Sequence, residues 1–143
     1  MHLKLGFVIG CKITTFLQIL QYAFYWMVTI QKASDFAVAI IELNKALLKK
    51  KEFEISCQVK RSGTAIGALI CEAQFAESPA DFIHKMRIAL KECHETEYWL
   101  NLLHRTHYIS DNQYNELLEQ NTVLKRMLIA SINTKNRNLE SSK

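Results

Sequence analysis

The sequence predicts an all-α protein, an antiparallel up-down-up-down four-helix bundle with an apolar N-terminal extension. Glycine and proline are scarce, with 4 and 1 copies in 143 residues, so the chain has few breaks. Apolar residues recur at three- and four-residue spacing through four segments, as they do on amphipathic helices. Short connections separate these segments, which makes neighbouring helices antiparallel. We expect the extension at 1–30, the bundle at 31–135 and a disordered polar tail at 136–143.

The extension contains an uncharged run from Ile13 to Ile30. Its length just reaches that of a bilayer span, but its glutamines and threonines weaken this interpretation. Three hypotheses stay open for it: a membrane anchor, a helix that packs on the bundle or on a partner, and an upstream translation outside the native domain. We favour the last two. No glycine or proline occurs between Lys12 and Lys60, so the run can continue directly into the first bundle helix.

The first bundle helix is expected from about Ser34 to Lys50, and the second from about Glu54 to Glu77. One apolar row marks the first helix: Phe36, Ile40, Leu43 and Leu47. The second helix carries small residues at helical spacing, where a neighbouring helix can approach closely: Ser62, Gly63 and Gly67. Each glycine costs a helix about 1 kcal/mol relative to alanine, so close packing is the expected compensation.

The opposite face of the second helix also carries small residues, Ala65 and Ala68, between Arg61 and Glu72. A helix with small residues on two sides is expected to pack on two sides. We therefore predict that this helix meets both its own bundle and another subunit.

The third helix is expected from Pro79 to about Tyr108, with Ser78 as its N-cap and Asp81 three residues later. Its predicted core row is Phe82, Ile83, Met86, Leu90, Cys93, Leu100 and Leu103. A second apolar row lies nearly opposite: Ile88, Trp99 and Leu102. Because one apolar face suffices for a monomeric bundle, we assign this second row to the subunit interface, together with Arg61, Ala65, Ala68 and Glu72.

Between the two apolar rows runs a basic and aromatic stripe: His84, Arg87, Lys91, His94 and Tyr98. Such a stripe can follow a nucleic-acid backbone, and the alternative is a solvated or subunit-facing stripe. We name Lys60, His84, Arg87 and Lys91 as hypothetical nucleic-acid contacts.

The fourth helix is expected to start after Ser110, with Gln113 in the capping-box position. Its predicted core row is Tyr114, Leu117, Leu118, Leu124, Leu128 and Ile132. These four helices complete the predicted bundle.

The residues indicate no catalytic machinery, no metal site and no cofactor. His104 and His107 form a lone HxxH pair, and no Glu-x-x-His motif of the di-iron type is present. Glu97 and His104 fall within the third helix's core row, where pairing is the expected role, with Arg61 a partner for Glu97 or Glu72. The four cysteines are scattered without a CxxC pair, which indicates a reduced, cytoplasmic protein. The net charge of +4 is only weakly basic.

Two segments of the chain carry distinctive motifs: the first runs from Gln58 to Ala73 and contains KRSGTAIGA, and the second runs from Asp81 to Leu100 and contains DFIHK and ETEYWL. These segments resemble the signatures of the bacterial four helix bundle protein family, related to the protein encoded in the intervening sequence of large-subunit ribosomal RNA. The resemblance covers about Ser34 to Thr134. It implies a homopentamer with a central channel. One related branch, the accessory variability determinant of diversity-generating retroelements, works with a reverse transcriptase and binds RNA. The family has no established catalytic residues, so none is carried over.

We therefore expect a non-enzymatic homo-oligomeric bundle that acts as an assembly or binding module. The expected partners are further copies of the chain and structured RNA, or a nucleoprotein of the reverse-transcriptase type. Two alternatives remain: a purely structural protein–protein oligomer without nucleic acid, and a membrane-anchored module held through residues 13–30.

Overall fold

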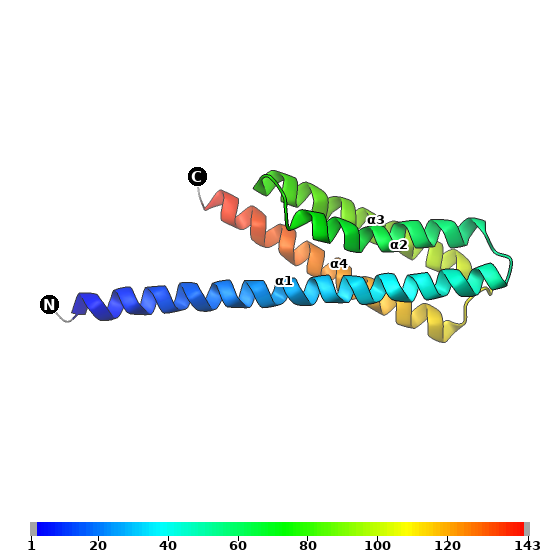
Figure 1. The fold of residues 1–143 in the computed structure, drawn as a ribbon, viewed down its shortest axis with the longest axis horizontal. Coiled ribbons are helices and arrows are strands. Elements are labelled where there is room, and N and C mark those ends of the chain that lie inside the picture. The colour runs from blue at the N-terminus through cyan, green and yellow to red at the C-terminus, as the bar shows by residue number, and fades with distance from the viewer. Residues whose placement is uncertain (1–2, 142–143) are drawn as a thin grey trace.

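The computed structural model describes the backbone of residues 3–141 and the side chains of residues 17–141. It contains four helices: α1 (Leu3–Lys49), α2 (Glu54–Ala73), α3 (Pro79–Arg105) and α4 (Asp111–Glu140). Consecutive helices pack against one another, and α1 also packs against α4, which closes the bundle (Figure 1). The described residues contain no strand. The predicted all-α four-helix bundle is therefore confirmed.

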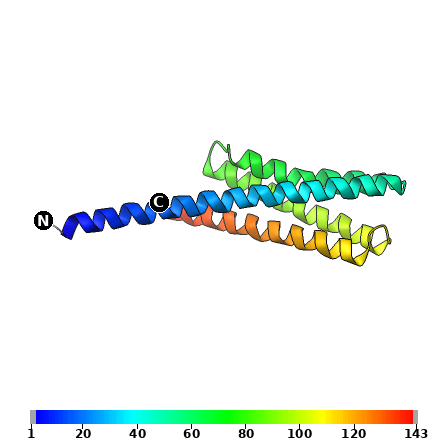
Figure 2. The same ribbon diagram turned by 60° about the horizontal axis from the view of Figure 1, so that its bottom comes forward.

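The helix α1 unites the expected extension with the first bundle helix. Its residues run from Leu3 to Lys49 without a break, because no proline or glycine interrupts the part that enters the bundle. Figures 1 and 2 show α1 continuing past the end of the bundle at which both chain ends lie. Within the described part of the chain, no helix is long and apolar enough to cross a lipid bilayer.

The predicted helix starts agree with the caps in the structure. The Ser78 hydroxyl accepts a hydrogen bond from the Asp81 N–H at 3.1 Å, and Ser110 forms a complete capping box with Gln113. These caps satisfy backbone N–H groups that have no partner within the helix.

The helix ends differ from the predicted ones. The helix α2 ends at Ala73 rather than at Glu77. The helix α3 ends at Arg105 rather than at Tyr108, and His107, two residues after this end, adopts a positive φ of 61°. The helix α4 continues to Glu140, so residues 136–140 are helical where a disordered tail was expected. Residues 142–143 of that tail lie outside the described residues.

The core is more polar than the apolar rows predict. The row on α1 is buried as expected, but four expected core residues are only half-buried: Phe82, Leu90, Tyr114 and Leu118. Buried positions on α3 and α4 are filled instead by Ala89, Thr96, Asn121 and Ser131. Hydrogen bonds compensate much of this burial, since Thr96 Oγ1 donates to Ser62 Oγ at 2.9 Å and Asn121 Nδ2 to the Cys93 carbonyl at 3.0 Å. Asn121 Oδ1 is buried without a partner among the described residues.

The small residues of α2 lie where the backbone approaches α1. A Cβ added at Gly63 would lie 2.8 Å from Ile40 Cγ1, closer than side-chain atoms approach one another. A Cβ at Gly67 would meet only the Ala33 carbonyl oxygen at 3.6 Å, an ordinary van der Waals distance. The fully buried Ile40 side chain has no space to move away. The α1–α2 contact therefore depends on glycine at 63 but not at 67.

We predict opposite effects for the two glycine-to-alanine substitutions. Gly67→Ala should stabilise the protein by up to about 1 kcal/mol, because alanine favours the helix and the added methyl fits. Gly63→Ala should instead destabilise it by about 1–3 kcal/mol, because the methyl overpacks Ile40. Denaturant unfolding of the two variants measures both values. Equal stabilisation by both substitutions would contradict the close contact.

Candidate functional site on the outer surface of α2 and α3

Ion pairs and a buried hydrogen bond align α2 with α3. Arg61 on α2 pairs with Glu95 on α3, and at the other end of the contact Lys85 Nζ lies 3.7 Å from Glu72 Oε2. Between the two helices, the buried Thr96–Ser62 hydrogen bond fixes the height of one against the other. The exposed row on α2 that begins at Arg61 and ends at Glu72 therefore runs along α3.

The second apolar row of α3 lies beside this row of α2. Trp99 Nε1 donates a hydrogen bond to Glu95 Oε1 at 3.2 Å, so the indole borders the Arg61–Glu95 pair. Ile88 and Leu102 stand seven residues before and after Glu95, and therefore on the same side of α3. We call the combined set the α2–α3 surface: Arg61, Ala65, Ala68, Glu72, Ile88, Trp99 and Leu102. Each of these residues is exposed or half-exposed.

The acids of this region have partners that differ from the predicted ones. Arg61 pairs with Glu95 rather than with Glu97 or Glu72. Glu97 pairs instead with Lys125 of α4, and Glu72 with Lys85. The spacing along a single helix does not predict Glu95, Lys85 or Lys125 as partners, because it does not contain the relative height of two helices.

Among the described side chains of the α2–α3 region, Glu92 is the one acid with a buried carboxylate oxygen that lacks a hydrogen-bond partner. Its Oε2 atom is buried and has no hydrogen-bond partner there. Burial raises the pKa of the Glu92 carboxyl, and the negative charge of Glu95 raises it further, while Arg61 acts in the opposite direction. The outer side of α2 and α3 thus contains a carboxyl group that lacks a donor.

The basic stripe lies on the exposed side of α3. His84, Arg87 and Lys91 follow one another at three- and four-residue spacing, and all three are exposed. None of them forms an ion pair within residues 17–141. The positive charge of Arg87 and Lys91 is therefore not neutralised by the bundle.

Lys60 lies apart from this stripe. It precedes Gly67 by seven residues, and Gly67 faces Ala33 of α1. Arg61, which pairs with Glu95 of α3, lies about 100° around the α2 axis from Lys60. The structure therefore brings three of the four hypothetical nucleic-acid contacts together and places Lys60 near α1 instead.

The remaining reactive side chains have structural environments. His104 Nε2 lies 2.7 Å from Asp111 Oδ1, and the His104 ring stacks on Tyr114 with 4.3 Å between centroids, at the corner that joins α3 to α4. Burial raises the pKa of the Cys93 thiol to about 12, so this thiol stays protonated. In the described part of the chain, no three His, Cys, Asp or Glu side chains come together as a metal site would require.

We predict that Glu92→Gln changes how stability depends on pH. The folded protein holds the Glu92 proton to a higher pH than the unfolded chain does, so this residue lowers stability as the pH rises through its raised pKa. We therefore compare the melting temperature of the glutamine variant with that of the unchanged protein at each pH. The variant minus unchanged difference should be more positive at about pH 7 than at about pH 4. Glu116→Gln, at an exposed position of α4, is the control. If the difference in melting temperature between variant and unchanged protein were equal at the two pH values, it would contradict the unfavourable environment of the Glu92 carboxylate.

Comparisons with known proteins agree with this architecture. A crystal structure of a protein of unknown function from the S23 ribosomal protein family of Bacteroides thetaiotaomicron VPI-5482 is 49% identical, with a TM-score of 0.75. The match covers 76% of this chain and 98% of that one. No curated protein matches the chain. The sequence pattern of the 23S rRNA-intervening sequence proteins matches residues 27–130, which is most of the chain. The chain therefore belongs to the 23S rRNA-intervening sequence protein family.

Proposed function

We propose that this protein is a homo-oligomeric binding module without enzymatic activity, whose copies meet through the α2–α3 surface. The observation that supports this most directly is the convergence of seven exposed or half-exposed residues from two helices on one side of the bundle. Three of them are large and apolar: Ile88, Trp99 and Leu102. Apolar side chains gathered on one surface favour association with a partner.

The chemistry of this surface suits a protein partner. Ala65 and Ala68 leave space for a neighbouring helix to approach α2. The Arg61–Glu95 pair and the Trp99 indole provide polar groups beside that space. Interfaces between proteins typically combine such an aromatic anchor with surrounding polar groups.

The family resemblance leads us to expect five copies around a channel. A contact between the α2–α3 surface and a different surface of the next copy is heterologous, and a heterologous contact closes into a ring when the rotation between copies permits it. The 16.6 kDa chain would then form a particle of five times this mass.

Structured RNA, alone or within a nucleoprotein of the reverse-transcriptase type, is the partner that we propose for the basic stripe. Arg87 and Lys91 are exposed and unpaired within the described residues, and they lie on the helix that also carries Ile88 and Trp99. In a ring built through the α2–α3 surface, every copy would present such a stripe. Repeated cationic stripes favour a phosphate backbone because each contact releases counterions. The alternative is an oligomer that acts through protein contacts alone.

We predict that Ala68→Arg lowers the mass of the assembly. A charged side chain in place of a methyl would block close approach at the α2–α3 surface without entering the core. Ala46→Arg, at an exposed position of α1, introduces the same residue away from this surface. Light scattering on the full chain measures the mass of both variants. A mass reduced only by the substitution at position 68 supports the interface, and equal masses would exclude it.

We predict that the double substitution Arg87→Ala with Lys91→Ala weakens RNA binding by roughly tenfold at low salt and makes the affinity less dependent on salt. The control is Lys49→Ala with Lys51→Ala, which removes the same charge from the end of α1 and the turn that follows it. Fluorescence anisotropy with a labelled RNA hairpin, measured over a range of salt concentrations, gives both quantities. Binding that is unaffected by the α3 variant, or equally weakened by the control, would show that the stripe is not the RNA contact.

A further inference from the structure

A second apolar row runs along α1, on the side that faces away from the bundle. Its ten positions alternate in steps of three and four residues from 17 to 48, and all ten side chains are exposed. Seven of them are large and apolar, with exposed fractions between 38% and 64%: Leu17, Leu20, Phe24, Met27, Val38, Ile41 and Leu48. The other three are Gln31, Ser34 and Lys45. We call these ten residues the outer row.

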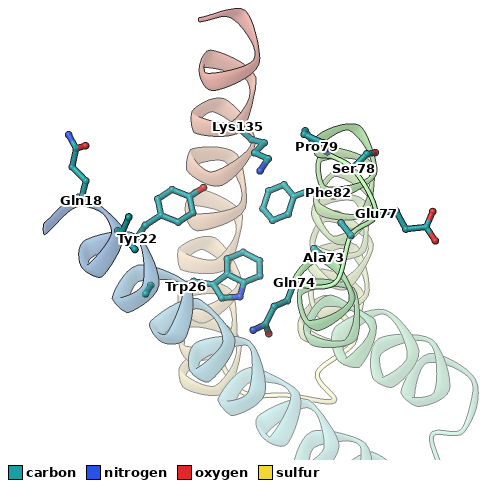
Figure 3. A pocket seen from close by; sticks show the side chains of 13 residues that line it. Gln18, Tyr22, Trp26, Ala73, Gln74, Glu77, Ser78, Pro79, Phe82 and Lys135 are labelled. Carbon is teal, nitrogen blue, oxygen red and sulfur yellow. The ribbon is translucent and has the colours of Figure 1, made fainter. Parts of the chain in front are cut away.

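The outer row lies nearly opposite the part of α1 that is buried in the bundle. Each core residue of α1 follows an outer position by two residues, as Ile40 follows Val38, which turns it by about 200° around the helix axis. At the free end of the bundle the core side of α1 borders an open groove of about 730 Å³. Figure 3 shows Trp26 pointing there from α1 toward Phe82 of α3, and the two ring centroids are 5.6 Å apart. No residue of the outer row lines this groove, so the folded chain leaves the row uncovered.

The spacing of the outer row is that of a coiled-coil seam. Steps of three and four residues repeat about every 3.5 residues, whereas an α-helix turns once in about 3.6, so such a row stays in contact when a second helix supercoils around the first. The seam is also narrow, because Asp35 and Glu42 border it. A helix that lies on a membrane has a broad apolar face and a basic polar face instead. The partner that fits this row is therefore another helix.

We infer that the outer row of α1 pairs with the outer row of a second copy of this chain, and that the two helices are antiparallel. The middle of the row consists of two polar residues, Gln31 and Ser34. Two apolar residues follow on either side, so the order of polar and apolar positions is the same in both directions from the middle. A two-fold axis beside this middle therefore brings like positions of two copies together.

The layers of this antiparallel pair match one another. Each position faces a position of the other copy, and the facing pairs are Gln31 with Ser34, Met27 with Val38, Phe24 with Ile41, Leu20 with Lys45, and Leu17 with Leu48. The Ser34 hydroxyl and the Gln31 amide can hydrogen-bond each other across the seam. A helix that was apolar at these positions would bury both groups without partners, at a cost in free energy. Polar residues within a seam select the partner and its register in this way.

Lys45 selects the antiparallel direction. A parallel pair in register would place Lys45 beside Lys45 of the other copy, where like charges repel. In the antiparallel pair Lys45 faces Leu20 instead, so its methylene groups can cover the leucine while its ammonium group stays in water. Within its own copy, Lys45 Nζ already pairs with Glu42 Oε1 at 2.6 Å. Antiparallel helices also oppose their dipoles.

This contact is separate from the α2–α3 surface. The outer row belongs to α1 alone, which packs on α2 and α4. Three of its positions, Leu17, Leu20 and Phe24, also precede residue 27, where the family match begins. The contacts differ in kind as well, because the pairing of α1 is two-fold whereas the proposed ring contact joins different surfaces. Pairing through α1 therefore does not depend on the ring.

The first experiment compares masses of the full chain by light scattering. Phe24→Glu with Ile41→Glu should halve the mass, because these positions face each other in the pair and would bury carboxylates together. The matched control, Ile19→Glu with Ala46→Glu, places the same charges on exposed positions of α1 outside the outer row and should leave the mass unchanged. Circular dichroism verifies that each variant is folded.

The masses decide between the two contacts as well. An unchanged mass for the outer-row variant, or an equal loss in the control, overturns the pairing of α1. Ala68→Arg tests the α2–α3 surface, so a failure of the proposed ring appears in that variant and not in this one.

The second experiment tests direction and register by disulfide formation. Met27→Cys is made in one chain and Val38→Cys in another, both with serine in place of Cys11, Cys57 and Cys71. The two chains should link when they are refolded together and oxidised. Neither should link to itself, because antiparallel helices separate identical positions by about 16 Å, beyond disulfide reach. A link within either chain alone, or no link in the mixture, overturns the antiparallel pair.

The third experiment offers a lipid surface instead of a second copy. Vesicles of phosphatidylcholine and phosphatidylglycerol are floated with the unchanged protein and with the variant that carries Phe24→Glu and Ile41→Glu. The outer rows of the unchanged protein are expected to stay paired, so that the protein does not float. Flotation that is lost in the variant would make a bilayer the occupant of the outer row and would overturn the proposal.

Discussion

The close approach of α1 to α2 at Gly63 is the contact on which the remaining arrangement depends. The backbone of α2 lies directly against Ile40, a fully buried side chain, so the two helices are fixed at one crossing point. On the adjoining side of α2, Ser62 accepts the hydrogen bond from Thr96 of α3. Neighbouring residues thus hold both partners of α2, and the row from Arg61 to Glu72 faces outward beside α3. The α2–α3 surface is a direct consequence.

Buried polar groups set the heights of the helices relative to one another. Asn44 Nδ2 donates to the Ser56 carbonyl at 3.0 Å between α1 and α2, and Asn121 Nδ2 donates to the Cys93 carbonyl at 3.0 Å between α4 and α3. Each of these hydrogen bonds is lost if one helix slides along the other, and the buried polar groups would then lack partners. The pairing of Arg61 with Glu95, and the place of Trp99 beside it, follow from this fixed register.

The sequence predicted those features that depend on neighbours along the chain. The starts at Ser78 and Ser110 follow from local capping chemistry, and the buried row on α1 follows from helical periodicity. Features that depend on two helices were not predicted in the same detail. The partner of Arg61, the burial of Thr96 and Asn121, and the side of α2 on which Lys60 lies all require the register between helices, which no single-helix pattern contains.

The length of α1 leaves residues 17–27, called the arm, largely uncovered by the other helices. Among the described side chains of α1, full burial begins at Thr29, and most large apolar side chains between residues 17 and 28 are exposed. The Tyr25 hydroxyl still donates to the Met127 carbonyl of α4 at 3.3 Å, so the arm leaves the bundle from a fixed position rather than as a loose end. Because α2 ends at Ala73, no neighbour covers the opposite side, and the groove opens there. The bundle alone therefore leaves several large apolar side chains of residues 17–27 exposed, on a different part of the molecule from the side formed by α2 and α3.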